Sequence, residues 1–258
     1  MTAKTRALVL LGAAALSATS VAQELTVAAA ADLSSALTEL AANYQKQTGT
    51  RVRLAFGSSG NLTQQIKNGA PFDLFFSADE DYPKQLMEER LAEQDSFYRY
   101  AVGRLILWVL KSSSLDIEHR GLKVLLDASV KKIAIANPQH APYGRAAVAA
   151  LRHFQLFDKV ADRLVLGENV SQAAQFVESG NAQVGLIALS PALEPSMRGS
   201  GRYWEVPSDA YPELDQAAVL LSRSQHKGEA AAFLGYMKMP EAQAILRGYG
   251  FWLPEEKH

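Results

Sequence analysis

Short apolar runs alternate with segments of helical periodicity along most of the chain. Leu25–Ala29 predicts a buried strand, and the apolar positions after it, Leu33 to Tyr44, recur on one helical face that ends at Gly49. The runs that predict further strands are Val52–Phe56, Leu74–Phe76, Leu105–Leu110, Ile133–Ala136, Leu164–Leu166, Val184–Leu189, Tyr203–Val206 and Ala217–Ser222. Strands that alternate with helices indicate the α/β class, with mainly parallel sheets flanked by helices.

The strands and helices form two series, which meet near residue 103 without a linker rich in Pro or Gly. We therefore predict two lobes that are joined by crossover strands acting as a hinge. Lobe 1 should comprise residues 23–102 and lobe 2 residues 103–215. Residues 216–258, which include the predicted helices Gly228–Lys238 and Pro240–Tyr249, should return to lobe 1.

Four loops lead into helices, two in each series, near Asp32, Ser59, Tyr143 and Val170. Pro142 suits the first position of the third helix, and Asn169 suits the N-cap of the fourth, with Gln172 completing a weak capping box. Ligands of open α/β sheets bind beyond the carboxyl ends of the strands, where all four helix starts should lie. We expect the lobes to face each other across a cleft at this edge.

The small residues at the helix starts predict an anion site. The first four N–H groups of a helix lack intrahelical acceptors, and the macrodipole adds about half a positive charge there. In Val27–Leu40 and Phe56–Leu62, residues of the types Ala, Gly and Ser leave that backbone accessible to a ligand. Small residues after a strand are also ordinary in α/β proteins, but their repetition favours a binding site.

Residues 1–22 have the features of a signal peptide. Lys4 and Arg6 precede the apolar run Ala7–Leu16, and Ser20-Val21-Ala22 is a small-x-small cleavage site. No later run approaches the ~20 apolar residues of a membrane helix. We predict that the mature chain begins near Gln23 and is exported.

Composition excludes several classes of protein. The 258 residues are 48% hydrophobic and 21% charged, as in globular proteins, and no cysteine is present for a disulfide or a thiolate metal site. Without Lys4 and Arg6, 24 basic and 27 acidic residues remain, a net charge of −3 that argues against nucleic acid as a partner. The five histidines show no metal-ligand spacing.

Six segments carry a resemblance to a known family. In order and at compatible spacing, they resemble the periplasmic molybdate-binding proteins of ABC transporters: LTVAAAADLSSAL, FGSSGNLTQQI, GAPFDLFFSAD, ANPQHAPYG, GENVSQAAQFVESGNAQVG and RGYGF. The resemblance implies a type II periplasmic binding-protein fold. It also implies a monomer, without enzymatic activity or cofactor, that captures molybdate and tungstate in the periplasm and delivers them to an inner-membrane permease.

The same resemblance implies an oxyanion site made of neutral donors. Carried over by position, these are Asp32, Ser59, Tyr143, Val170 and Ala188. Ser59 keeps a hydroxyl and an N–H group, whereas Tyr143 and Val170 need contribute only N–H groups. Ala188 departs from relatives that have a tyrosine hydroxyl there, and we expect Tyr143, Ser34 or water to replace that donor.

Asp32 departs from relatives that have a hydroxyl residue. An ionised carboxylate 4 Å from a dianion would be repelled by about 8 kcal/mol at an effective dielectric constant of 20. Asp32 must therefore cap its own helix, be protonated, or accept a proton from an anion such as hydrogen phosphate. Aspartate is a good N-cap, so we favour the cap. The third alternative keeps phosphate or a phosphonate as a possible ligand, and a binding protein for phosphate, phosphonate or sulfate is the second hypothesis.

A secreted serine hydrolase is the alternative from another class. Ser59 and His140 supply its residue types, but Gly57-Ser58-Ser59-Gly60 is followed by Asn61, where the nucleophile elbow GxSxG requires glycine. We expect His140 to be a surface or structural residue, because no carboxylate stands at a spacing that would orient it. Arg145 is expected to be a solvated surface residue, and Trp108 to belong to the core.

Overall fold

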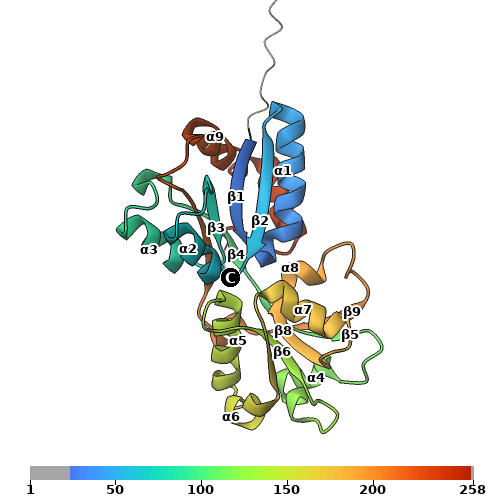
Figure 1. Cartoon of the computed structure of the whole chain (residues 1–258). Helices are drawn as coiled ribbons and strands as arrows, with labels where there is room; N and C mark the ends of the chain where they lie inside the picture. Colours follow the sequence, from blue (N-terminus) through green and yellow to red (C-terminus); the bar gives the residue numbers. More distant parts are fainter. Residues whose placement is uncertain (1–23, 257–258) are drawn as a thin grey trace, which may run out of the picture.

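The computed structural model describes residues 24–256, so the predicted signal peptide lies outside the described residues. Two five-stranded sheets form two lobes, one above the other in Figure 1. The first sheet has the order β2-β1-β3-β10-β4, with bounds Arg51–Gly57, Glu24–Ala30, Leu74–Ser77, Leu214–Leu220 and Tyr98–Gly103. The second has the order β7-β6-β8-β5-β9, with bounds Leu164–Gly167, Ile133–Ala136, Val184–Ala188, Leu105–Leu110 and Gly201–Glu205.

In each sheet three strands pair in parallel, and a single reversed strand joins them to the fifth through two antiparallel pairings. In lobe 1, β1 pairs in parallel with β2 and β3, while β10 is antiparallel to β3 and β4. In lobe 2, β6 pairs in parallel with β7 and β8, while β5 is antiparallel to β8 and β9. The predicted α/β class with mainly parallel sheets is confirmed.

Helices cover both faces of each sheet. Those of lobe 1 are α1 (Ser34–Thr48), α2 (Ser59–Lys67), α3 (Asp81–Glu88), α9 (Lys227–Met237) and α10 (Pro240–Gly248). Those of lobe 2 are α4 (Ile117–Arg120), α5 (Pro142–His153), α6 (Phe157–Val160), α7 (Val170–Glu178) and α8 (Leu189–Ala192). A 3-10 turn, η1 (Ala31–Leu33), joins β1 to α1.

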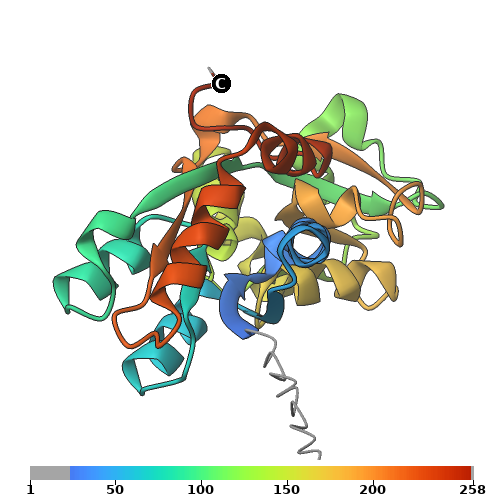
Figure 2. The same ribbon diagram turned by 90° about the horizontal axis from the view of Figure 1, so that it is seen from above.

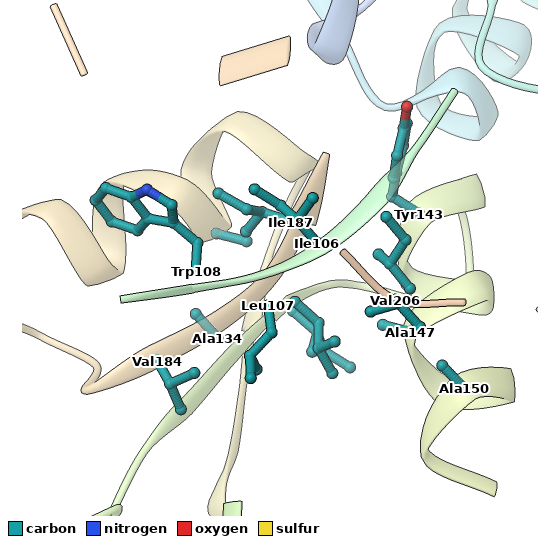
Figure 3. Packing of buried hydrophobic residues seen from close by; sticks show 14 of the residues in the cluster. Ile106, Leu107, Trp108, Ala134, Tyr143, Ala147, Ala150, Val184, Ile187 and Val206 are labelled. Atoms are coloured by element: carbon teal, nitrogen blue, oxygen red, sulfur yellow. The ribbon is translucent and has the colours of Figure 1, made fainter. Parts of the chain in front are cut away.

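The alternation of side chains along β1 fixes which helices cover which face. Val27 and Ala29 join the core cluster that contains residues of α1, α9 and α10, whereas Ala28 joins the cluster formed with α2 and α3. The predicted apolar face of α1 is buried throughout. A single larger cluster forms the core of lobe 2 and includes Trp108, as predicted. Figure 3 shows part of this cluster.

The chain crosses between the lobes twice. β4 ends at Gly103 and β5 begins at Leu105, so these strands follow one another across the molecule in Figure 2. The chain returns between β9 and β10, and α9 and α10 then pack in lobe 1. Trp252, beyond α10, forms a backbone bridge with Val102 of β4. Both crossings therefore lie beside the C-terminal segment.

The strand β4 is missing from the sequence-based prediction, and the short helices α4, α6 and α8 are missing too. Tyr98–Gly103 reads YRYAVG, which mixes charged, aromatic and small residues. Its strand conformation depends on the hydrogen bonds with β10, a segment more than 100 residues later in the chain. A single-sequence pattern carries no information about such a partner.

Candidate functional site

A small cavity, with about 10 Å³ of free space, lies where the two lobes meet. It is lined by residues that follow the carboxyl ends of β1, β2 and β3 in lobe 1 and of β6 and β7 in lobe 2. The lining residues are Ala30, Ala31, Asp32, Gly57, Ser58, Ser59, Ala78, Ala141, Pro142, Tyr143, Asn169 and Val170. Among these described residues only Asp32 has an ionisable carboxyl, and none has a basic side chain.

The four predicted helix starts meet at this cavity. Pro142 is the first residue of α5, and Asn169 caps α7, accepting a hydrogen bond of 3.0 Å from the N–H group of Gln172, as predicted. Ser58 is the N-cap of α2. The N–H groups of Ser59, Tyr143 and Val170 lie in first turns and so have no intrahelical acceptor. Two lobes thus direct helix N-termini at one small volume.

Ser59 is held as an oriented donor. Its hydroxyl oxygen accepts a 3.0 Å hydrogen bond from the N–H group of Ala78, and the side chain is buried, with 1% of the residue exposed. A hydroxyl that already accepts one bond retains its proton for a second partner. Because Ser59 and Ala78 both line the cavity, the cavity is the available place for that partner.

Asp32 lies at the centre of a buried polar network. Its Oδ2 accepts a hydrogen bond of 2.6 Å from Nε2 of Gln216, whose amide nitrogen also lies 3.3 Å from the hydroxyl of Tyr143. The hydroxyl of Tyr100 donates to Oε1 of Gln216 at 2.7 Å. Asp32 is 2% exposed, and its Oδ1 is buried without a hydrogen-bond partner among the described residues.

The favoured prediction, that the Asp32 side chain caps the helix following β1, is wrong. Neither η1 nor α1 has a side-chain cap, and the residue at the N-cap of η1 is Ala30. Asp32 is the second residue of η1, so its side chain already lies beyond the N-cap position. The carboxyl instead reaches across to β10, where Gln216 binds it.

Burial raises the pKa of the Asp32 carboxyl to about 6. The hydrogen bond from Gln216, together with the nearby Tyr143 hydroxyl and the N–H groups of Asp32 and Leu33, favours the ionised form but only partly offsets the desolvation. No basic side chain contributes to this balance among the described residues. The carboxyl is therefore far easier to protonate than an ordinary aspartate.

Gln216 and Tyr100 were not identified from the sequence. Gln216 is fully buried in β10, and its only local signal is a polar residue directly before an apolar run. Tyr100 lies in β4, the strand that the sequence pattern did not reveal. Both act on Asp32 through contacts that only the folded sheet creates.

The remaining predicted site residues differ in their placement. Val170 lines the cavity at the start of α7, and Tyr143 lines it at the start of α5. Figure 3 shows the side chain of Tyr143 directed away from the apolar side chains of its own lobe. Ala188 does not line the cavity: it is fully buried at the end of β8, where it pairs with Leu105. Ser34 is also outside it, and donates to Glu194 at 3.3 Å.

Hydrogen bonds close the lobes around the cavity. The N–H group of Gly60 donates to the carbonyl of His140 at 2.9 Å. The hydroxyls of Ser171 and Ser190, both in lobe 2, donate to the backbone carbonyls of Ala31 and Asp32 at 3.0 and 2.7 Å. The structure is thus a closed form, in which the backbone of η1 is bound by the opposite lobe.

Two predicted surface residues take part in this closure. The guanidinium of Arg145 in lobe 2 pairs with the carboxylate of Asp79 in lobe 1, and 39% of the Arg145 side chain is exposed. The expectation of a solvated arginine is therefore wrong, because the fold brings a partly buried carboxylate to it. His140 has the structural role expected, since its Nδ1 lies 2.8 Å from the hydroxyl oxygen of Ser58.

These contacts give the hydrolase hypothesis no support. His140 faces Ser58, whereas the Ser59 hydroxyl is bonded to the N–H group of Ala78. A general base must lie within hydrogen-bond reach of the nucleophile that it activates. Within residues 24–256, no group of three or more His, Asp or Glu side chains is arranged to hold a metal ion.

We predict that Asp32→Asn stabilises the protein at pH 7.5. Because the folded-state pKa is raised, ionisation of Asp32 lowers the free energy of unfolding as pH rises through the range from about 4 to about 6. An amide avoids this cost, which is at most about 3 kcal/mol from the shift in pKa. Thermal melting without ligand should show an increase of several degrees at pH 7.5 and little change at pH 4.5.

The matched control is Asp95→Asn, at an exposed carboxylate. It should change the free energy of unfolding by no more than about 0.5 kcal/mol at either pH, and so leave both melting temperatures nearly unchanged. An equal shift for Asp32→Asn at both pH values, or a loss of stability at pH 7.5, would contradict the assignment of a buried, costly carboxylate.

Comparison with known proteins identifies the family to which this two-lobed chain belongs. Residues 25–252 match the family model described as bacterial extracellular solute-binding protein. The molybdate-binding protein ModA of Azotobacter vinelandii is 38% identical over 248 residues, which cover 96% of this chain and 97% of that protein. ModA of Rhodobacter capsulatus is 38% identical over 228 residues, 88% of each chain.

Solved structures agree. The periplasmic molybdate-binding protein of Azotobacter vinelandii superposes with a TM-score of 0.85 at 38% sequence identity, over 90% of this chain and all of that one. The expected two-lobed periplasmic binding-protein fold and the resemblance that implied it are confirmed. These relatives are named as binding proteins, not as enzymes.

Within residues 24–256, no helix has the length and apolar character to cross a membrane. The chain belongs to the bacterial extracellular solute-binding proteins.

Proposed function

We propose that this protein captures molybdate, and also tungstate, in the cavity between its lobes. The observation that carries the proposal is the meeting of helix N-termini from both lobes at one small cavity with no basic side chain among its described lining residues. Peptide N–H groups at helix starts bind anions without a formal positive charge. The names of relatives at 38% identity supply the identity of the anion.

The size of the cavity supports a small inorganic ligand. Pockets for drug-sized organic molecules are typically 300–1,000 Å³, whereas the free space in this cavity is about 10 Å³, enough for about one water molecule. Direct contacts between the lobes leave little space for a larger ligand in the closed form, because Gly60 touches His140 beside the cavity. Even a tetrahedral oxyanion would need the lobes to part slightly to enter, and the convergence of donors from several directions suits such an ion.

The proposed donors are the N–H groups of Ser59, Tyr143 and Val170, and the hydroxyl of Ser59. Asp32 would contact the anion from η1. The buried Tyr143 hydroxyl is the candidate replacement for the donor absent at Ala188. No cofactor takes part, since the anion is bound and released without chemical change.

Binding would act through closure of the lobes. An anion that contacts both lobes has a higher affinity for the closed form than for an open one, and it shifts the population accordingly. We further propose that the mature protein is a periplasmic monomer and that the closed form is recognised by an inner-membrane ABC permease, which receives the anion.

Phosphate or a phosphonate is the second candidate ligand, and one observation favours it. The unpartnered Oδ1 of Asp32 would accept a hydrogen bond from a protonated anion such as hydrogen phosphate. Sulfate carries no proton at neutral pH and lacks this advantage. The preference between molybdate and phosphate therefore distinguishes the two proposals.

A thermal-shift panel tests the proposed ligand. Molybdate and tungstate should raise the melting temperature strongly, because a ligand at 1,000 times its Kd stabilises the native state by about 4 kcal/mol. Sulfate and phosphate should have little effect at the same concentration. A shift with phosphate alone would support the second candidate, and no shift with any oxyanion would refute the proposed function.

Gly60→Ala tests the role of closure. A Cβ at this position would lie 2.8 Å from the carbonyl oxygen of His140 in the opposite lobe and 2.5 Å from the hydroxyl of Tyr82 in its own lobe. The Tyr82 hydroxyl ends a side chain that can move, whereas the His140 carbonyl is backbone, so the variant cannot close in the same way. We expect molybdate affinity, measured by calorimetry, to fall by roughly tenfold or more, which corresponds to at least 1.4 kcal/mol.

The folded lobe should tolerate the same change, because alanine favours helices more than glycine by about 1 kcal/mol. The displacement of the Tyr82 side chain offsets part of this gain, so the melting temperature without ligand should change little. Gly235→Ala is the matched control: it is also a helical glycine, and nothing lies within 4 Å of an added Cβ. Wild-type affinity in Gly60→Ala would show that this contact plays no part in binding.

A further inference from the structure

The carboxyl of Asp32 poses a problem for any anion in this cavity. Asp32 lines the cavity and is 2% exposed, and its Oδ1 is buried without a hydrogen-bond partner among the described residues. A buried acceptor without a partner is costly, and an ionised one beside an anion adds repulsion. The geometry therefore calls for a proton or a donor at Oδ1.

The groups around the carboxyl determine where a proton can reside. Oδ2 accepts the hydrogen bond from Gln216 in β10, so that oxygen is already used as an acceptor. The hydroxyls of Tyr143 in α5 and Tyr100 in β4 are the titratable groups that face the site, and burial raises the pKa of both phenols, which stay neutral. A proton on the carboxyl consequently belongs on Oδ1.

No basic side chain among the described groups around Asp32 supplies a positive charge or a hydrogen-bond donor to Oδ1. The elements of lobe 2 packed against η1 are α7 and α8, and they bind its backbone carbonyls through Ser171 and Ser190. Asp79, whose charge reaches Tyr100, is paired with Arg145. Glu194 accepts from the hydroxyl of Ser34, at the start of α1. Among these described groups, none offers a cation to Asp32.

We propose that Asp32 takes up a proton together with the oxyanion and donates a hydrogen bond to it from Oδ1. The proton comes from solvent and stays on the carboxyl while the anion is bound. A neutral carboxylic acid then resembles the neutral donors that the other helix starts provide, and the repulsion disappears. The inference rests on the proposed function and adds that molybdate binding weakens as pH rises.

The sign of the effect follows from linkage. Without ligand, burial already raises the pKa of Asp32 to about 6, so above that pH the free protein has lost the proton. A bound dianion disfavours the carboxylate further and keeps the proton in place. Each pH unit above about 6 should therefore weaken binding by up to tenfold, with an uptake approaching one proton per anion.

Calorimetric titration with sodium molybdate at pH 6.5, 7.5 and 8.5 tests this inference. Repeating each titration in buffers of different ionisation enthalpy measures proton uptake directly. We expect Kd to increase by about tenfold between pH 7.5 and 8.5 with uptake close to one proton. A constant Kd without proton uptake would overturn the inference while leaving the proposed function intact.

Asp32→Asn separates this role from a purely structural one. The amide oxygen can accept from Gln216 while its NH₂ group donates to the anion, as the protonated acid would. We expect Kd in the variant to be independent of pH and, at pH 8.5, at least tenfold lower than in the wild type. Weaker binding than wild type at every pH would overturn the inference.

Glu194→Gln is the matched control. It removes a carboxylate that contacts Ser34 across the lobes, outside the cavity lining, and should retain the pH dependence of the wild type. Loss of the pH dependence in this control would assign the proton to Glu194 and contradict the role of Asp32. If phosphate binds at neutral pH without proton uptake and molybdate does not bind, the ligand proposal itself fails.

Discussion

The proposed function depends on one electrostatic constraint: a small anion would have to be removed from water in a cavity that lacks basic side chains among its described lining residues. The only positive potential available there comes from peptide dipoles at helix starts, which are weak singly and effective when several converge. Convergence requires parallel strands that end at the same edge in each lobe and lobes that face each other. The order of strands in both sheets supplies this arrangement.

The same constraint explains the contacts that close the lobes. The helix start at Ser59 is held against the loop before α5, and the hydroxyls of Ser171 and Ser190 bind the backbone of η1. Each lobe thus secures the loop that the other presents to the cavity. Asp32 is the exception among neutral groups, and its network with Gln216 and Tyr100 shows how a carboxyl can be kept in such a site with a strongly raised pKa.

Much of this arrangement could be predicted from the sequence, because the relevant signals are local. Pro142 and Asn169 identify helix starts through short-range stereochemistry, and the apolar runs identify the central strands. The small residues near Asp32, Ser59, Tyr143 and Val170 indicated that four helix starts would meet, and these four residues do line one cavity.

The rest depended on contacts between distant segments. Gln216 binds Asp32 across 184 positions of sequence, and Arg145 finds Asp79 across 66, so neither pair leaves a local pattern. The expected N-cap role of Asp32 failed because a 3-10 turn begins at Ala31, two residues earlier than the pattern suggested. Ala188, inferred by position alone, is enclosed within its own sheet.

A crystal structure with molybdate bound would test the central claim most directly. It should place the anion in the cavity, with its oxygens 2.7–3.2 Å from the N–H groups of Ser59, Tyr143 and Val170, and with no lysine or arginine side chain in contact. An anion bound elsewhere, or one held in the cavity by a basic side chain, would contradict the account that peptide dipoles from two lobes suffice.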